Sequence, residues 1–214
     1  MSFLKKSNEK VFCIGLNKTG TTTIEKFFND YNFRVGDQSE AEFLVNDWFK
    51  RDFRKIISYC KKYDAFQDAP FSLPYTFIIL EQYFPRAKFI LTLRDNPEQW
   101  YNSLTKFHSK LWSNGEDAPT IEELKNAKYR YKGYAYDVNR ALFNTPEHDP
   151  YNKELLINYY NDHNNNVKEY FRSQSHKLLT INVSVQADYF RLCDFLEKTA
   201  VGNNFSWENK TNNP

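Results

Sequence analysis

The chain has 214 residues, of which 41% are hydrophobic and 18% aromatic, so it can build the core of one folded domain and is not a disordered chain. Its 29 Lys and Arg nearly balance its 27 Asp and Glu, and a net charge of +2 disfavours a nucleic-acid-binding protein, which usually has a strongly basic face. Its three cysteines, Cys13, Cys60 and Cys193, lie far apart, so neither a disulfide framework nor a cysteine-rich zinc site is expected.

No run of about 18 apolar residues predicts a membrane span, and the first residues lack a signal-peptide core. We therefore predict a cytoplasmic protein.

In the first half of the chain, short apolar runs alternate with segments that have helical spacing. Residues 11–16 are an apolar run that predicts a buried strand, and Ile24, Phe27 and Phe28 predict a helix over residues 21–31. The elements expected next are a short strand at 33–36, helical segments at about 40–49 and 53–63, a strand at 65–68 ended by Pro70, and a helix from Pro74 to Tyr83.

The second half continues this alternation around a long irregular stretch. Residues 88–93 form the clearest strand, and Arg94 lies at its carboxyl end. Thr120 and Glu123 have the spacing of a capping box, which predicts a helix that runs toward Phe143. The other expected elements are helices at about 97–110, 153–172 and 189–198, a strand at 178–181, and a loop-like tail from Gly202.

Strands that alternate with helices indicate the α/β class, with a parallel sheet covered by helices on both faces. In such sheets, ligands bind outside the carboxyl ends of the strands. This rule selects three places: the loop after Leu16, residues 68–71, and the segment that begins at Arg94. These three places also carry the residues with the most distinctive chemistry.

The segment from Gly15 to Thr22 follows a strand and opens a helix, an arrangement that points backbone N–H groups and a helix N-terminus at an anion. Its glycine spacing matches the ATP-binding loop GxxxxGK[ST] up to Gly20, but Thr21 stands where that motif requires lysine. The only lysine of the loop is Lys18. The threonines could instead simply cap the helix, but their combination with a glycine and a lysine favours an anion site.

Asn17-Lys18-Thr19-Gly20-Thr21-Thr22 resembles the 5′-phosphosulfate loop of the sulfotransferases that use PAPS, 3′-phosphoadenosine 5′-phosphosulfate. The resemblance implies a P-loop-like sulfotransferase fold, PAPS as the co-substrate, and sulfuryl transfer without a metal. It also implies that Lys18 stabilises the charge on the bridging oxygen of the departing phosphate. The residues that the resemblance assigns to PAPS binding are Asn17, Lys18, Thr19, Gly20, Thr21, Thr22 and Thr23.

A second segment, from Leu93 to Ser103, resembles the 3′-phosphate segment of the same family. There an arginine at a strand end and a serine in the next helix converge on one phosphate, and the guanidinium makes a two-pronged contact. The resemblance implies that Arg94 and Ser103 bind the 3′-phosphate of PAPS. Asn96 makes this segment one residue longer than usual, so Asn102 is the alternative to Ser103.

The acceptor must lose a proton, and a positioned base usually contributes about 10²–10⁴-fold to such a reaction. The resemblance places Asp68 where cytosolic family members have a histidine as the base, with Pro70 at the position of the family's proline. Asp68 is therefore the expected base; alternatively, it only caps the turn before Pro70. His163, on an apolar stripe of a helix, is the second choice, followed by His108. No pair of histidines has metal-ligand spacing, so no metal site is expected.

We expect one sulfotransferase-like domain over residues 1–214, with a nucleotide-binding core at about 10–110, a helical acceptor-side region at about 112–175, a last strand and helix at 177–200, and a tail at 201–214. The expected function is transfer of a sulfuryl group from PAPS to a hydroxyl or amine of a small-molecule or glycan acceptor, with Lys18 and Asp68 as the catalytic residues. The alternatives are a P-loop kinase or NTPase and a catalytically inactive nucleotide-binding module. Residues 112–150 carry no chemistry that identifies the acceptor.

Overall fold

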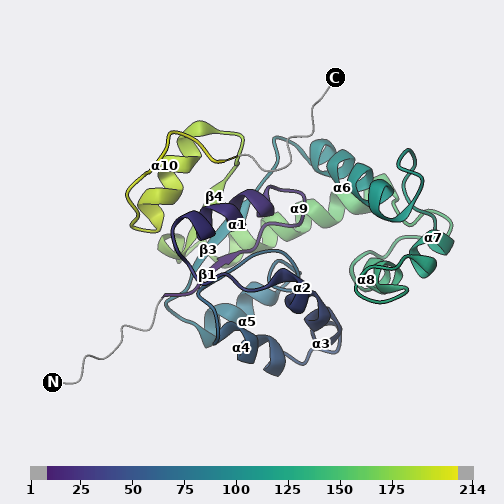
Figure 1. The fold of residues 1–214 in the computed structure, drawn as a ribbon, viewed down its shortest axis with the longest axis horizontal. Helices are drawn as coiled ribbons and strands as arrows, with labels where there is room; N and C mark the ends of the chain where they lie inside the picture. Colours follow the sequence, from purple (N-terminus) through teal and green to yellow (C-terminus); the bar gives the residue numbers. More distant parts are fainter. Residues whose placement is uncertain (1–8, 207–214) are drawn as a thin grey trace.

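The computed structural model describes residues 9–206, and its sheet has four parallel strands in the order β2-β1-β3-β4 (Figure 1). The strands are β1 (Val11–Cys13), β2 (Ala65–Phe66), β3 (Lys88–Thr92) and β4 (Leu178–Ile181). Because the pairing is parallel throughout, the carboxyl ends of all four strands meet at one edge of the sheet. This edge is where the fold rule places a ligand.

The central strand β1 lies between β2 and β3, so that Phe12 is opposite both Phe66 and Phe89. The rings of Phe66 and Phe89 stack on that of Phe12, with centroid separations of 4.8 and 5.6 Å. Side chains alternate along a strand, so Val11 and Cys13 point to the opposite face. The sheet therefore divides the hydrophobic core into two layers.

Helices cover both layers, which confirms the predicted α/β architecture (Figure 1). The layer of Val11 and Cys13 packs against α1 (Thr21–Asp30) and α10 (Gln186–Phe195). The layer of Phe12 packs against α4 (Arg54–Cys60), α5 (Thr76–Tyr83) and α9 (Lys153–Tyr170). Full burial of each large apolar side chain in these layers stabilises the fold by about 1.5–3 kcal/mol.

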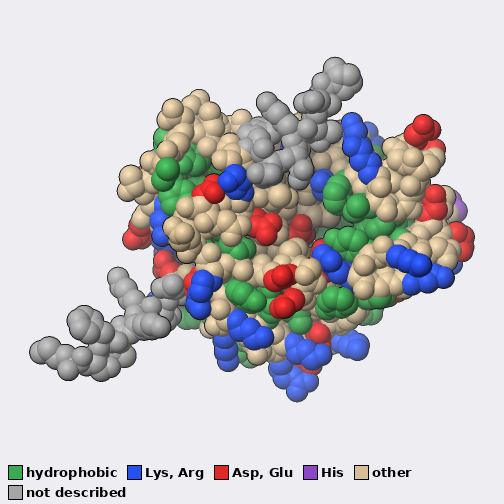
Figure 2. All heavy atoms as spheres, viewed as in Figure 1, with side chains coloured by type: hydrophobic (Ala, Val, Ile, Leu, Met, Phe, Trp, Pro, Cys, Tyr) green, Lys and Arg blue, Asp and Glu red, His purple; other side chains and the backbone are tan. Residues whose placement is uncertain are grey.

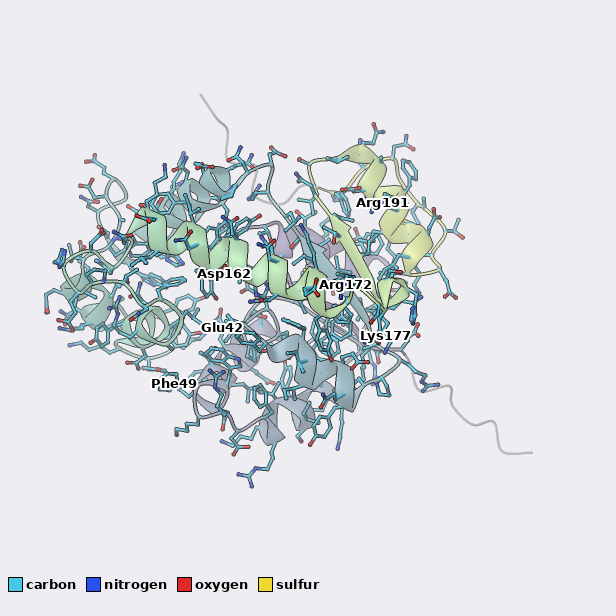
Figure 3. The ribbon with its side chains drawn as sticks, turned by 180° about the vertical axis from the view of Figure 1, so that it is seen from behind. Glu42, Phe49, Asp162, Arg172, Lys177 and Arg191 are labelled. Carbon is cyan, nitrogen blue, oxygen red and sulfur yellow. The ribbon has the colours of Figure 1, made fainter. Side chains whose placement is uncertain are left out.

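A third packed region surrounds Trp100, next to the loop that follows β1. There α6 (Pro97–Trp112) packs against α9, and α7 (Ile121–Asn126) packs against α8 (Tyr134–Leu142). Seen from behind, α9 crosses the molecule with Asp162 on it, and Arg172 and Lys177 lie near its far end (Figure 3). The remaining helical segments are α2 (Gln38–Ala41), η1 (Glu42–Leu44), α3 (Val45–Phe49) and η2 (Ser175–Lys177).

The strands predicted at 11–16, 33–36, 65–68 and 88–93 are all shorter in the structure, and the first two differ most from expectation. The strand predicted at 11–16 ends at Cys13, because the apolar residues that follow belong to a buried loop rather than to the sheet. The strand predicted at 33–36 is reduced to a single bridge between Val35 and Ala65. Burial of an apolar run therefore did not distinguish the strand from the loop that continues it.

The helix predicted to run from Thr120 toward Phe143 is two helices. The capping box of Thr120 and Glu123 is present, but α7 ends at Asn126. A new helix, α8, begins after Gly133, whose φ of +88° lies in the left-handed region. The tail predicted at 201–214 is described only as far as residue 206; residues 207–214 lie outside the described residues. Between residues 9 and 206, no helix has the length and apolar character needed to cross a membrane.

Candidate functional site

Three segments meet at the carboxyl edge of the sheet, as the fold rule predicts. The loop of residues 14–20 follows β1, Asp68 follows β2, and Arg94 follows β3. Thr21, the first residue of α1, donates a hydrogen bond from Oγ1 to Asp68 Oδ2 at 3.3 Å. Arg94 Nε donates to the backbone oxygen of Lys18 at 2.6 Å. The structure thus brings four of the predicted site residues into one constellation.

The loop after β1 is packed tightly against the end of β3. A Cβ atom at Gly15 would lie 2.0 Å from Thr92 Oγ1 and 2.6 Å from the Thr92 backbone oxygen, so only glycine fits there. The fully buried Thr19 hydroxyl donates to Leu16 O at 2.5 Å and accepts from Thr92 Oγ1 at 2.5 Å. The Thr19 side chain therefore shapes the loop from inside, and Thr92, which the sequence did not single out, is its partner.

Two buried side chains hold the same loop from outside. The Trp100 indole Nε1 donates to Asn17 O at 3.0 Å, and its ring stacks on Tyr160 at 4.9 Å. His163 Nε2 donates to Ile14 O at 2.8 Å. Since the carbonyl can only accept, this bond fixes the proton of His163 on Nε2. The loop is thus bonded to β3, α6 and α9 at once.

The N-terminus of α1 faces this site without a side-chain cap. Gly20 precedes the helix with a φ of +104°, and no side chain among the described residues caps it. The N–H groups of Thr21, Thr22 and Thr23 occupy the first turn, where an α-helix has no internal acceptors for them. Such a terminus favours an anion through both its N–H groups and its dipole.

Two cations lie on this side of the site. Lys18, at a φ of +67°, holds its ammonium 3.7 Å from the centroid of the Phe107 ring. Burial, followed by repulsion from Arg94, lowers the pKa of Lys18. Burial also lowers the pKa of Arg94. Two partly buried cations that repel each other would both be stabilised by a bound anion.

Asp68 supplies a carboxylate at the same edge of the sheet. It adopts a φ of +59°, a conformation that aspartate and asparagine tolerate better than most residues. Its Oδ1 accepts a hydrogen bond from its neighbour Ala69 N at 2.8 Å, while Oδ2 faces Thr21. Burial raises the pKa of Asp68 above its ordinary value, opposed by hydrogen bonds from Ala69 and Thr21 and by the charge of Lys18. A desolvated carboxylate of this kind is a stronger proton acceptor than a free one.

The two histidines considered as alternative bases are buried, and both bond to groups inside the protein. His163 is 3% exposed, and burial lowers its pKa to about 4. His108 Nδ1 lies 2.8 Å from Tyr151 Oη, and burial lowers its pKa to about 3. His163 supports the loop from behind, a role that its position on an apolar helical stripe did not reveal.

Asn96, the extra residue between Arg94 and Ser103, has a structural role at the start of α6. Asn96 is the N-cap of α6, because its Oδ1 accepts from Gln99 N at 2.8 Å, and Pro97 is the first helical residue. Ser103 is the seventh residue of α6 and half-buried, whereas Asn102 is exposed. Ser103 stays the predicted partner for a phosphate near Arg94, with Asn102 as the alternative.

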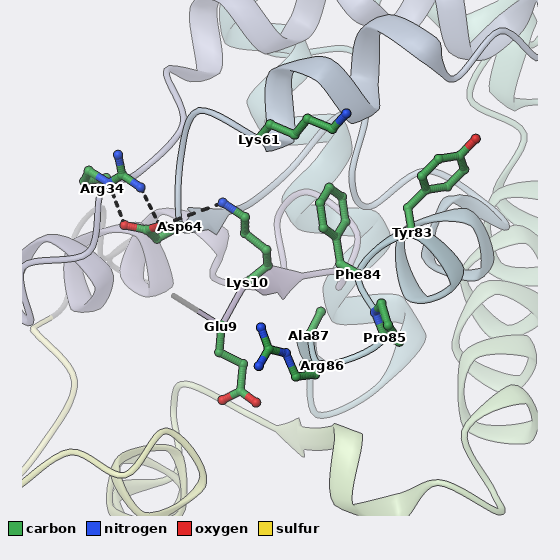
Figure 4. Close-up of a pocket in the computed structure, with 10 residues that line it drawn as sticks. All are labelled: Glu9, Lys10, Arg34, Lys61, Asp64, Tyr83, Phe84, Pro85, Arg86 and Ala87. Carbon is green, nitrogen blue, oxygen red and sulfur yellow. Dashed lines mark hydrogen bonds and ion pairs between the residues drawn. The ribbon is translucent and has the colours of Figure 1, made fainter. Parts of the chain in front are cut away.

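A cleft of about 500 Å³ lies at the opposite, amino edge of the sheet (Figure 4). It is lined by Lys10 before β1, Asp64 before β2, and Phe84 after α5. Asp64 pairs with Arg34 at 2.8 Å and with Lys10 at 3.8 Å, so these charges are satisfied within the protein. The cleft therefore does not compete with the carboxyl edge as the functional site.

Residues 9–206 contain no group of three or more His, Cys, Asp or Glu side chains placed to hold a metal ion. A family model described as "Sulfotransferase domain" matches residues 10–213 of the chain. No curated protein matches it.

Proposed function

The chain belongs to the sulfotransferase domain family, and we propose that it transfers a sulfuryl group from PAPS to a hydroxyl or amine of an acceptor. The observation that carries this proposal is the 3.3 Å contact between Thr21 Oγ1 and Asp68 Oδ2. It sets a carboxylate beside an uncapped helix N-terminus that suits a phosphosulfate. A proton acceptor and an anion-binding loop are the two parts that in-line transfer needs.

Each group on the donor side has a distinct task in this proposal. The first turn of α1 and the loop N–H groups bind the 5′-phosphosulfate, while the Arg94 guanidinium and the Ser103 hydroxyl bind the 3′-phosphate. Arg94 Nε is already bonded to Lys18 O at 2.6 Å, so its terminal nitrogens are the ones that reach a phosphate. In this scheme PAPS is a substrate, and no metal takes part.

The chemical step divides between Asp68 and Lys18. Asp68 accepts the proton of the acceptor hydroxyl as the acceptor oxygen forms a bond to sulfur. The bond between sulfur and the bridging oxygen breaks, and 3′-phosphoadenosine 5′-phosphate (PAP) leaves with the negative charge. Lys18 neutralises this charge as it develops, so the stabilisation that its ammonium provides is greatest in the transition state.

The competing function is that of a P-loop kinase or NTPase. Thr21 replaces the lysine that such enzymes place after the second glycine, which counts against ATP chemistry. A thermal-shift comparison of PAP without metal and of ATP with Mg²⁺ separates the two functions. At about 100 times Kd, PAP should raise stability by about 2.7 kcal/mol.

For a domain of this size, that free energy corresponds to a Tm increase of about 5–10 °C. PAP should produce this increase and Mg-ATP should not. Stabilisation by Mg-ATP alone would contradict the proposal in favour of phosphoryl transfer. Stabilisation by PAP without release of PAP from PAPS in the presence of any acceptor would indicate a binding module without catalysis.

A further inference from the structure

We infer that the acceptor is a hydroxyl compound that also carries an ammonium group, and that Glu25 binds this ammonium beside Asp68. The inference rests on the proposed function and names the acceptor class of the same site. It follows from the distribution of charge and aromatic rings around Asp68, on the side of the site away from Arg94.

Glu25 lies on α1 one helical turn after Thr21, whose hydroxyl contacts Asp68. Residues four apart lie on the same face of a helix. The Glu25 carboxylate is half-buried and interacts electrostatically with Asp68 and Asp37. In the space-filling view, Asp and Glu side chains gather on the face between α1 and α2 (Figure 2). Glu25 thus extends the negative charge of Asp68 outward along α1.

Two other carboxylates, one near Asp68 and one near Glu25, already have partners within the protein. Glu42 (labelled in Figure 3) forms an ion pair with Arg130. Asp37 Oδ1 accepts from Ser39 N, Ser39 Oγ and Glu40 N at the start of α2. The structure gives Glu25 no ion pair among the described residues, and burial, Asp68 and Asp37 all raise its pKa. A cation bound at the Glu25 carboxylate would relieve this repulsion.

Two tyrosines near Asp68 lie beside a cation of the protein itself. The Arg130 guanidinium lies 4.5 Å from the centroid of the Tyr129 ring while it pairs with Glu42. Tyr134 packs beside Tyr129 at 5.6 Å, and both tyrosines lie within electrostatic reach of Asp68. Carboxylates combined with aromatic faces are the usual means by which proteins bind ammonium groups. The surroundings of Asp68 therefore combine carboxylates with aromatic rings, a chemistry that suits an ammonium group.

A buried hydrogen-bond acceptor lies in the same region. Gln67 is 5% exposed, and its Oε1 has no donor among the described residues. Its Nε2 donates to Gln38 Oε1 at 3.5 Å, and Gln38 Nε2 donates to Ala69 O at 2.7 Å, directly after Asp68. An ammonium has three donors and no acceptor, so it suits a site with surplus acceptors.

The reacting atom of such an acceptor is its hydroxyl oxygen. The Glu25 carboxylate favours the charged form of the amine, which has no lone pair for attack on sulfur. The hydroxyl forms the new bond to sulfur and gives its proton to Asp68, while the sulfur–oxygen bond to the 5′-phosphate breaks and PAP leaves. The products are the sulfate monoester, which retains its ammonium, PAP and the proton released from Asp68.

Three phenols that differ in charge test the inference: tyramine is cationic, 4-propylphenol neutral, and 3-(4-hydroxyphenyl)propionate anionic. With PAPS as donor, kcat/KM of the wild type should be at least about tenfold higher for tyramine than for 4-propylphenol, and lowest for the propionate. Glu25→Gln should abolish the tyramine preference through a higher KM, with kcat and the Kd for PAP unchanged. Glu25→Asp should restore part of the preference.

The matched control is Asp30→Asn, which removes an exposed carboxylate of the same helix that pairs with Lys26 at 2.9 Å. This control should keep the wild-type preference. Equal kcat/KM for tyramine and 4-propylphenol, or a preference that survives in Glu25→Gln, would overturn the inference. Turnover of phenols without charge selection would leave the proposed function intact. If no phenol reacts, the binding of tyramine and 4-propylphenol to the PAP complex is measured by calorimetry, and tyramine should bind more tightly. Equal binding of the two phenols, or binding of neither, would overturn the inference. Failure of PAP itself to bind would overturn both proposals.

Discussion

Replacement of Asp68 by asparagine removes the proton acceptor while it preserves the local structure. Asparagine tolerates the φ of +59° at this position as well as aspartate does. Its Oδ1 can still accept from Ala69 N, and its Nδ2 can donate to the Thr21 hydroxyl, which rotates to accept. Both hydrogen bonds of Asp68, at 2.8 and 3.3 Å, are therefore kept in the variant.

The size of the effect follows from the role assigned to this carboxylate. A general base contributes about 10²–10⁴-fold, so kcat should fall by at least about 100-fold, equivalent to about 2.7 kcal/mol of transition-state stabilisation. The Kd for PAP should not change, because Asp68 contacts the acceptor rather than the nucleotide in the proposed scheme.

The thermal stability of Asp68→Asn should not fall with its kcat. Burial raises the pKa of Asp68 in the folded state, so the neutral carboxyl favours folding below the unfolded pKa of about 3.9, and this contribution is lost as pH rises through the folded pKa. Asparagine is neutral at every pH. At pH 7 the Tm of Asp68→Asn should therefore equal or exceed that of the wild type.

The assay combines kcat with a phenol acceptor, the Kd for PAP, and Tm for wild type and variant. The wild-type kcat/KM should fall as the pH is lowered, with a midpoint above the ordinary aspartate value, because only the ionised carboxylate accepts a proton. The variant should lose this pH dependence. Near-normal turnover in Asp68→Asn would refute the role as base and would leave Asp68 as a turn cap.

Three further predictions concern the loop and its supports. Lys18→Ala should lower kcat far more than PAP affinity, and Arg94→Ala should do the reverse, because the 3′-phosphate does not change during transfer; equal effects on kcat and Kd in both variants would refute this division. Gly15→Ala should lower the free energy of unfolding by about 3 kcal/mol in a urea titration, because its Cβ would lie 2.6 Å from the Thr92 backbone oxygen. A loss below about 1 kcal/mol would contradict the close packing. Trp100→Phe should cost about 1–3 kcal/mol of stability and weaken PAP binding, since the Asn17 carbonyl loses its donor. Unchanged Tm and Kd would contradict this support.

The sequence predicted which segments meet at the carboxyl edge of the sheet, because the fold rule needs only the order of strands and helices. Asp68 and Arg94 follow predicted strands, and the structure brings both to the loop after β1. The family resemblance added the tasks of Lys18 and Asp68, which no periodicity contains. These tasks stay predictions until the variants are measured.

The supports of the site could not be predicted, because they join residues far apart in the chain. Trp100 Nε1 reaches Asn17 across 83 positions, and His163 Nε2 reaches Ile14 across 149. In the sequence, each appears only as an aromatic or a histidine on a helix. The ion pair of Arg130 and Glu42, 88 positions apart, depends in the same way on how the segment between α7 and α8 lies against η1. Local patterns carry no signal of such pairs.

The bonds that hold the loop after β1 also decide when its conformational entropy is lost. Restricting one residue's backbone costs about 1–2 kcal/mol, so the six residues from Gly15 to Gly20 represent about 6–12 kcal/mol. Because Thr92, Trp100 and His163 fix the loop within the folded chain, this cost belongs to folding rather than to association. A nucleotide that meets a loop already in shape keeps more of its contact energy as affinity. We expect its binding to be a single fast step, without a slow phase of loop ordering.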